Sequence, residues 1–306
     1  MKKFLCIIIA CCFTFMLTSC DDKIYPSEYP VSAAYTMNDL MLPLASETDV
    51  IEDVQHRVRI DYSNVSSGYI RVKRLIDDGR KMKVKVLKNG ITYPAGHAEP
   101  RYDMDTLNKY ETFPLPNGDG EYRIRIMLQT DTLKYMEILE LKLSVDIQDE
   151  QAVFLYPNQI VDYEMENEAI AFSFALCAED NNDLQRVKTI YDYIVKHISY
   201  DDEKVEATKD NYALPVLDEI LATKKGVCFD YAALFAAMCR AQHIPCKVIV
   251  GDTTIAYHAW VEVWLEEKGW IDPSTLFEAK EWTRLDPTFA STKADYDDEY
   301  ITVYMY

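Results

Sequence analysis

The hydrophobic pattern of this 306-residue chain changes its period part-way along. Between His56 and Ile147, apolar and polar residues alternate in short segments such as HRVRIDY, GYIRVKRL, KMKVKVLK and GEYRIRIMLQ, with turn residues between them. Alternation with a period of two is typical of strands that bury one face. The Asn89-Gly90 pair before ITY also predicts a tight β-hairpin. We therefore expect residues 56–147 to form an all-β sandwich.

Helical spacing replaces this alternation in the second half of the chain. Between Asp183 and Ile198, apolar side chains recur at steps of three and four residues, and Asp183 is a candidate N-cap. A second helix is expected from about Pro215, because proline fits the first helical turn. The strong helix formers after Gly226 predict a third. The chain is thus expected to be α+β, with the β-domain first.

The first 20 residues have the layout of an export signal. Two lysines precede an apolar run, Phe4–Leu17, which at about 14 residues is too short to span a bilayer. The segment LTSC ends at Cys20 and resembles the bacterial lipobox, whose cysteine carries the lipid; an ordinary secretory signal is the alternative. We expect residues 1–19 to be a lipoprotein signal peptide. Residues 20–55 would then contain the lipidated cysteine and a tether.

These features predict an exported protein that a lipid anchors to a bacterial membrane. Two acidic residues follow Cys20 and resemble a surface-export signal, so the cell surface is one candidate location and the periplasm is the other. The net charge is −19, and residues 148–306 hold 13 Lys or Arg against 30 Asp or Glu. This acidic half argues against nucleic acid as a partner, because phosphate binding needs clustered basic residues.

The cysteines show no metal-binding pattern. Four of them lie beyond the signal, at Cys177, Cys228, Cys239 and Cys246, with no CxxC pair and no His/Cys cluster. A structural zinc site is therefore not expected, and no EF-hand loop indicates calcium. We expect neither a metal nor a cofactor.

One cysteine and one histidine suggest thiol chemistry when they are taken together. Cys228 should lie in the first turn of a helix, where free N–H groups and the helix dipole favour the thiolate. In HAWVEVWL, His258 shares one strand face with Trp260, Glu262 and Trp264. Either residue alone is more typical of a structural role. As a pair with an aspartate, they form the set that thiol acyl transfer needs: a nucleophile, a proton acceptor and a group that orients it.

The segments KGVCFDYAALFAAMCRAQHIPCKVIVG, YHAWVEVW and WTRLDPTF resemble the transglutaminase-like superfamily of papain-type thiol enzymes. The resemblance covers roughly Asp183 to Tyr306. It implies that residues 148–306 form a papain-like transglutaminase core of helices and an antiparallel sheet behind the sandwich. By position, it makes Cys228 the nucleophile and His258 the general base.

The aspartate has two candidates. Asp272 follows His258 by 14 residues and is reachable across a simple hairpin that turns near residues 266–269. Asp286 precedes Pro-Thr, which is the family's pattern and favours it as the third member. The resemblance also implies an upstream oxyanion donor, for which Tyr212 is the candidate beside the backbone N–H of Cys228. Tyr257 is expected either to line the cleft or to pack.

The expected function is attack on peptide or carboxamide carbonyls through a Cys-His-Asp triad and a thioester intermediate. Peptide hydrolysis is favoured, and transglutaminase or deamidase activity is the alternative. A non-catalytic surface binding or scaffold lipoprotein is an alternative of another class. The expected partner is a protein or peptide substrate. The sandwich, with 16 basic and 13 acidic residues, is also a candidate for glycan or cell-wall contact, and His97 is expected at a solvent-facing position.

Overall fold

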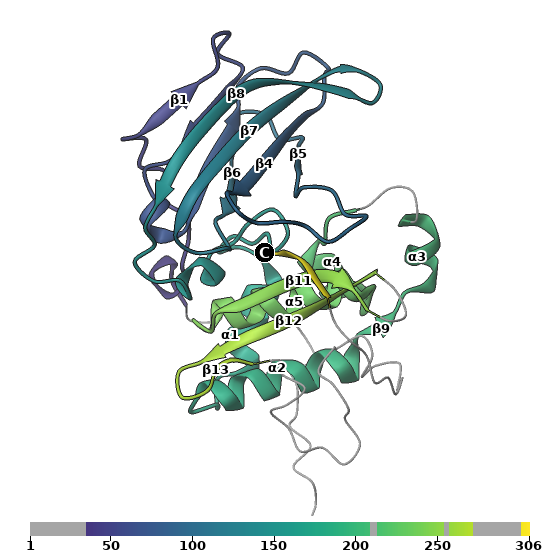
Figure 1. Ribbon diagram of the computed structural model, residues 1–306. Coiled ribbons are helices and arrows are strands. Elements are labelled where there is room, and N and C mark those ends of the chain that lie inside the picture. Colours follow the sequence, from purple (N-terminus) through teal and green to yellow (C-terminus); the bar gives the residue numbers. More distant parts are fainter. Residues whose placement is uncertain (1–34, 209–212, 254–256, 272–300) are drawn as a thin grey trace, which may run out of the picture.

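The computed structural model describes residues 35–208, 213–253, 257–271 and 301–306. The described chain has a strand-rich first part and a second part of helices around a sheet (Figure 1). Three short 3-10 helices accompany the first part, namely η1 (Met37–Asp39), η2 (Val65–Ser67) and η3 (Ala152–Leu155). None of the described helices is long and apolar enough to cross a membrane.

The first part is a β-sandwich of two antiparallel four-stranded sheets. One sheet has the order β1 (Val50–Glu52), β2 (Val58–Asp61), β3 (Tyr69–Arg74) and β6 (Tyr110–Pro114). The other has the order β5 (Tyr102–Met104), β4 (Met82–Lys88), β7 (Gly120–Asp131) and β8 (Lys134–Val145). Alternate residues of both sheets share one apolar core, which includes Val58, Ile60, Ile70, Val72, Val84, Val86, Ile124 and Ile126. The N-terminal all-β fold is confirmed, and its limits at residues 56 and 147 stay a prediction.

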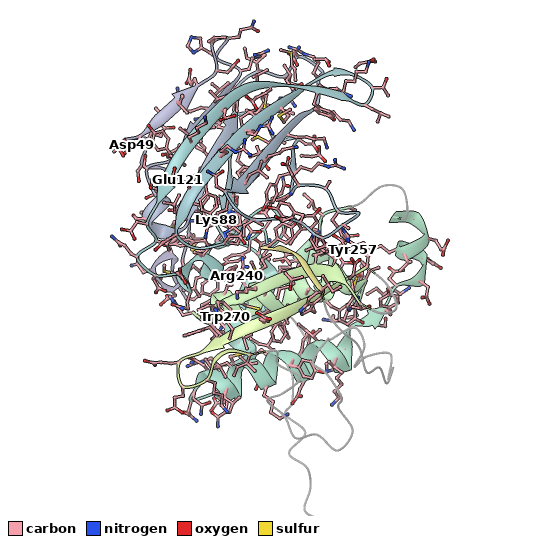
Figure 2. All side chains as sticks on the ribbon, viewed as in Figure 1. Asp49, Lys88, Glu121, Arg240, Tyr257 and Trp270 are labelled. Carbon is pink, nitrogen blue, oxygen red and sulfur yellow. The ribbon has the colours of Figure 1, made fainter. Side chains whose placement is uncertain are left out.

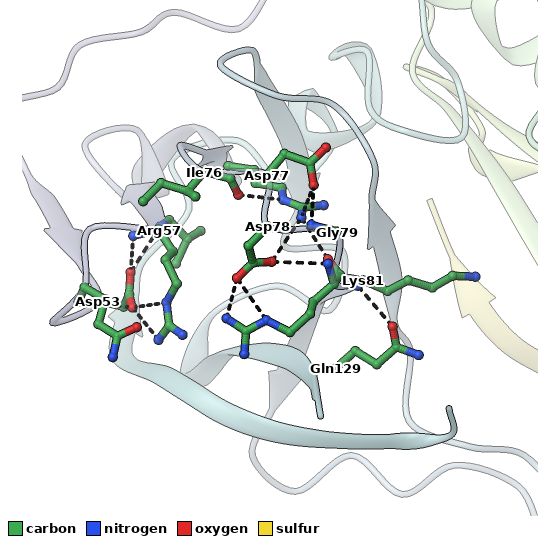
Figure 3. Close-up of polar contacts among 12 residues, drawn as sticks. Asp53, Arg57, Ile76, Asp77, Asp78, Gly79, Lys81 and Gln129 are labelled. Carbon is green, nitrogen blue, oxygen red and sulfur yellow. Dashed lines mark hydrogen bonds and ion pairs between the residues drawn. The ribbon is translucent and has the colours of Figure 1, made fainter. Parts of the chain in front are cut away.

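Aspartates hold the loops at one end of the sandwich (Figure 3). Asp53 is buried, and it accepts hydrogen bonds from the side-chain Nε of Arg57 at 2.8 Å and from the backbone N–H of Val58 at 3.1 Å. Arg74, also buried, donates to Asp77 at 2.9 Å and to the carbonyl of Arg80 at 2.8 Å. The bonds of Asp53 hold the connection between β1 and β2, and those of Arg74 hold the connection between β3 and β4.

The tight hairpin predicted at Asn89-Gly90 is not formed. A turn is present, since the N–H of Ile91 donates to the carbonyl of Lys88 at 3.4 Å and Gly90 has a φ of 86°. However, no strand follows directly, and β4 pairs instead with β5 after a loop of residues 91–101, here called the 91–101 loop. Pro94 and Pro100 lie in this loop, and proline has no N–H to donate to a strand ladder.

The second part confirms the predicted helices and antiparallel sheet. Its helices are α1 (Glu168–Leu176), α2 (Asp183–His197), α3 (Asp202–Thr208), α4 (Leu217–Thr223) and α5 (Cys228–Ala241). Its sheet has the order β13 (Gly269–Ile271), β12 (Tyr257–Leu265), β11 (Cys246–Asp252) and β14 (Ile301–Met305). A short parallel pair joins β9 (Ser199–Tyr200) to β10 (Lys225–Gly226).

Helix α5 lies at the centre of this part. Every residue from Phe229 to Ala241 is buried, because α1, α2 and α4 contact the helix together with strands β11 and β12. Helix α2 differs from its prediction at its start: the N-cap is Asn182, not Asp183. The side chain of Asn182 accepts from the N–H of Gln185 at 3.0 Å. Its extended backbone suits this role, and Asp183 is already the first helical residue.

A buried arginine of α5 joins three separate segments. The Arg240 guanidinium is fully buried. It donates to the carbonyls of Tyr156 at 2.8 Å, Cys246 at 2.8 and 3.0 Å, and Tyr306 at 2.8 Å. These carbonyls belong to the segment after η3, to the start of β11 and to the segment after β14. Figure 2 shows Arg240 near the junction of the two parts.

Aromatic contacts complete this junction. Phe154, from the sandwich core, meets the ring of Trp270 on β13 edge-on, with 5.2 Å between centroids. The ammonium of Lys247 lies 3.7 Å from the centroid of the Trp270 ring. Tyr102 of β5 meets Tyr306 edge-on at 5.9 Å. The sandwich therefore packs directly on the second part, and we expect the two to keep a fixed arrangement.

Replacing Arg240 by methionine should destabilise the protein, because the carbonyls of Tyr156, Cys246 and Tyr306 lose the hydrogen bonds that this buried guanidinium donates. We expect the free energy of unfolding to fall by roughly 2–5 kcal/mol in denaturant titrations. Arg186→Met is the matched control, since Arg186 makes one ion pair with Asp183 at the surface and its side chain is 29% exposed. That change should cost about 0.5 kcal/mol or less. Equal losses for the two variants would contradict a special role for Arg240.

Candidate active site

The start of α5 positions Cys228 as the first helical residue. Val227 before it is extended, and its N–H donates to a carboxylate oxygen of Asp230 at 2.9 Å. Asp230 is 1% exposed and folds back toward Gly226. A Cβ at Gly226 would lie 2.7 Å from the Cβ of Asp230, so this approach requires glycine. The segment Gly-Val-Cys-Phe-Asp thus fixes where the cysteine lies.

A lysine from α3 balances the buried carboxylate beside the cysteine. The ammonium of Lys204 lies 2.9 Å from one oxygen of Asp230 and 2.7 Å from the other. A buried carboxylate without such a partner would be costly. Its negative charge would also oppose a thiolate two residues away, and the ammonium reduces this effect.

Strand β12 positions His258 near its beginning. His258 is 6% exposed and pairs with Gly251 of β11. A Cβ at Gly251 would lie 2.0 Å from the backbone carbonyl oxygen of Ile301, so the missing side chain lets β14 approach β11 beside the histidine. The residues expected on the other face of β12 lie in the core, as the alternation predicts: Ala259, Val261, Val263 and Leu265.

Cys228, Tyr257 and His258 line one cavity of about 710 Å³. The structure therefore brings together the cysteine and the histidine. Tyr257, which was expected either to line the cleft or to pack, is part of the cavity lining. Cys228 is partly exposed, whereas the other three cysteines of the described residues are buried. Burial raises the pKa of the Cys239 thiol well above its usual value. Cys228 is thus the accessible thiol of the described chain.

The remaining predicted site residues lie outside the described residues. These are Asp272, Asp286, Tyr212 and Cys20. The hairpin predicted before Asp272 is present: β12 and β13 are antiparallel, and residues 266–268 form the turn. Among the described residues there is no group of three or more His, Cys, Asp or Glu side chains that could hold a metal ion.

One residue of the sandwich that was expected to face solvent lies in the site region instead. His97, in the 91–101 loop, approaches a carboxylate oxygen of Asp252 with its Nε2 at 2.7 Å. Its ring stacks on Tyr257 with 5.6 Å between centroids. The expectation of a solvent-facing position is therefore wrong, because the loop leaves the sandwich and reaches the second part. The prolines of the loop were the available signal that no strand runs there.

Several side chains that line the cavity have shifted pKa values, among them Tyr257 and Glu111. Burial raises the pKa of Tyr257, and the nearby Tyr304 and Asp252 raise it further, so the phenol stays neutral. Burial also raises the pKa of Glu111, on the sandwich side of the cavity. This carboxylate accepts from Thr106 at 2.6 Å and from Gln159 at 2.7 Å, which offsets part of that effect.

Comparisons with known proteins agree with the motif resemblance. Residues 170–274 match the model of the transglutaminase-like superfamily. This stretch is a transglutaminase-like core. It contains both Cys228 and His258, and the match supports a thiol enzyme.

Two curated relatives share part of the chain. Human (Homo sapiens) "Kyphoscoliosis peptidase" is 31% identical over 145 residues, which are 44% of this chain and 21% of the relative. The mouse (Mus musculus) protein of that name is 36% identical over 112 residues, 33% of this chain and 17% of its own length. The aligned part of this chain thus spans about a fifth of these relatives.

The similarity to solved structures is looser. A "Putative Cysteine Protease" from Cytophaga hutchinsonii is 13% identical with a TM-score of 0.35, over 78% of this chain and 91% of that one. Red sea bream transglutaminase is 12% identical with a TM-score of 0.29, over 66% and 47%. At these TM-scores, the likeness says nothing about activity.

The ion pair beside Cys228 should show energetic coupling in a double-mutant cycle. Lys204→Met leaves the buried Asp230 carboxylate without its cation, so we expect the free energy of unfolding to fall by about 1–3 kcal/mol. In an Asp230→Asn background, which keeps an oxygen to accept from Val227, the same change should cost about 0.5 kcal/mol or less. Denaturant unfolding of the four proteins measures this coupling, and additive losses would argue against it.

Glu111→Gln should stabilise the protein at neutral pH. The raised pKa means that the folded state holds the Glu111 proton more tightly than the unfolded chain. The glutamate's stability contribution is therefore lost as pH rises through its folded pKa, and glutamine avoids this loss. Melting curves should show a gain at pH 7.5 that disappears below the ordinary glutamate value of 4.5. Glu121→Gln, at an exposed position of β7, is the control; an equal gain there would contradict the explanation.

Proposed function

We propose that this protein is a thiol enzyme that hydrolyses peptide or carboxamide bonds. The observation that carries the proposal is that Cys228, at the start of a buried helix, and His258, at the start of a core strand, line the same cavity. The match of residues 170–274 to the transglutaminase-like superfamily supports it. The curated relatives are named as peptidases, which favours hydrolysis over amine transfer.

The proposed reaction has two halves. Cys228 loses its proton to His258, and its sulfur attacks the carbonyl carbon to form a thioester. The C–N bond breaks, and the amine or ammonia leaves with the proton from His258. Water then attacks the thioester with His258 as the base, which releases the acid and restores the thiol. A primary amine in place of water would give a transglutaminase.

The local structure favours the first step. Cys228 is in the first turn of a 14-residue helix, where the positive end of the helix dipole stabilises a thiolate. The rigid strand around His258 limits its motion, which helps to hold a base in position. In this proposal Asp286, or alternatively Asp272, orients the His258 ring.

Selective alkylation and turnover assays test this proposal. Cys228 should react with iodoacetamide near neutral pH faster than Cys177, Cys239 or Cys246, as peptide mass mapping would show. His258→Ala should slow that reaction. It should also lower kcat/KM on a fluorogenic peptide library by about 10²–10⁴-fold, and Cys228→Ala should abolish turnover.

Each alternative has its own outcome in these assays. Incorporation of a fluorescent primary amine into casein without cleavage would show that hydrolysis is the wrong choice of acceptor. A Cys228 that reacts no faster than the buried thiols, and that does not respond to His258→Ala, would instead favour a non-catalytic scaffold. Matched melting temperatures for all variants would show that the fold is intact.

A further inference from the structure

The cavity at Cys228 has walls from both parts of the molecule. The transglutaminase-like core contributes Cys228, Tyr257 and His258. The sandwich contributes Arg101, Tyr110 and Glu111 among others. A volume of about 710 Å³ is in the range of sites that take a ligand of several residues or drug size. A ligand that fills this cavity would therefore touch the sandwich as well as the core.

The 91–101 loop connects these walls at one edge of the cavity. His97 bonds Asp252 at the end of β11 and stacks on Tyr257 at the start of β12. The hydroxyl of Tyr304 on β14 donates to the carbonyl of Ala98 at 2.6 Å. One short stretch of the loop thus contacts three neighbouring strands of the core sheet. Figure 2 shows Tyr257 at this edge, near the sandwich.

Tyr257 is placed to contact a substrate. It lines the cavity, directly precedes His258 and remains 52% exposed. An amphipathic ring at a cavity edge offers large contact area and a polar tip, which is why tyrosine is common at binding surfaces. The stacked His97 ring holds the tyrosine in one orientation, and the side chain of His97 is only 19% exposed. A ring that is already held in place loses less entropy when a ligand binds.

We infer that the 91–101 loop makes the β-sandwich part of the substrate site, with Tyr257 contacting a bound peptide and His97 as its positioning residue. This inference rests on the proposed function for its choice of a peptide ligand. It assigns the sandwich a role in recognition of the substrate beside the thiol. It also separates recognition, at Tyr257 and His97, from bond breaking, at Cys228 and His258.

Two probes that alkylate Cys228 distinguish recognition from reactivity. Iodoacetamide is small and reports the reactivity of the thiol. A tetrapeptidyl chloromethyl ketone must first occupy the cavity, after which a C–S bond forms and chloride leaves. Saturation kinetics of the second probe give a binding constant KI and a maximal labelling rate separately.

We expect His97→Ala and Tyr257→Ala to raise KI for the peptidyl probe about five- to tenfold, with the maximal rate and the iodoacetamide rate within about twofold of the parent. His97→Phe, which keeps a ring for stacking, and Tyr257→Phe should stay close to the parent KI. His97→Gln, which has no ring, should resemble His97→Ala. A general structural effect would instead slow both probes and lower the melting temperature of every His97 variant.

The outcomes separate this inference from the proposed function. An unchanged KI in His97→Ala and Tyr257→Ala, or labelling of the parent by the peptidyl probe that does not saturate, overturns the inference. Iodoacetamide labelling that is not selective for Cys228, or whose rate does not change in His258→Ala, overturns the proposed function regardless of the value of KI. A raised KI in His97→Phe equal to that in His97→Ala would show that stacking is not the cause.

Discussion

The buried guanidinium of Arg240 is the contact on which the arrangement of the site depends. An arginine fork can donate several hydrogen bonds in fixed directions, and here it binds carbonyls of three segments that are far apart in the sequence. Because Arg240 belongs to α5, the helix that begins with Cys228 is tied to the start of β11, to the segment after β14 and to the connection from the sandwich. Those ties fix the helix against the sheet that carries His258, so a contact remote from the cysteine sets the geometry around it.

Patterns that depend on neighbouring residues could be predicted from the sequence. The change of period located the sandwich before the helices, and the alternation in β12 placed His258 opposite the core face. The Gly226 to Asp230 segment is equally local, and the start of α5 follows it.

Contacts between distant segments could not be predicted in this way. The 91–101 loop leaves its sheet because prolines interrupt it, and His97 finds partners about 155 residues away. Asn and Asp are equally good N-cap residue types, so composition could not show which of the two adjacent residues, Asn182 or Asp183, caps α2.

Burial divides the cysteines of the described residues into two kinds. Cys177, Cys239 and Cys246 are packed into the core of the second part, where a charged thiolate would be poorly solvated. Cys228 is partly exposed at a helix start and borders the cavity. The same protein interior that stabilises the fold therefore also shields three thiols from solvent, and it leaves Cys228 as the thiol that a reagent can reach. Neither helix dipole nor histidine could provide this selectivity if the other cysteines were equally accessible.

The close approach of β14 to Gly251 has a consequence for how the molecule assembles. Strand β14 pairs with β11, although many residues separate them in the sequence. Bringing together two strands that are this far apart in the sequence costs entropy that only the finished sheet repays. The helices and the hairpins of the sandwich depend on contacts between residues that are closer in the sequence, so a smaller entropy cost precedes their formation. We therefore expect the edge of the cavity beside His258 to take shape late on the folding path, after the elements that carry the cysteine and the histidine have already formed.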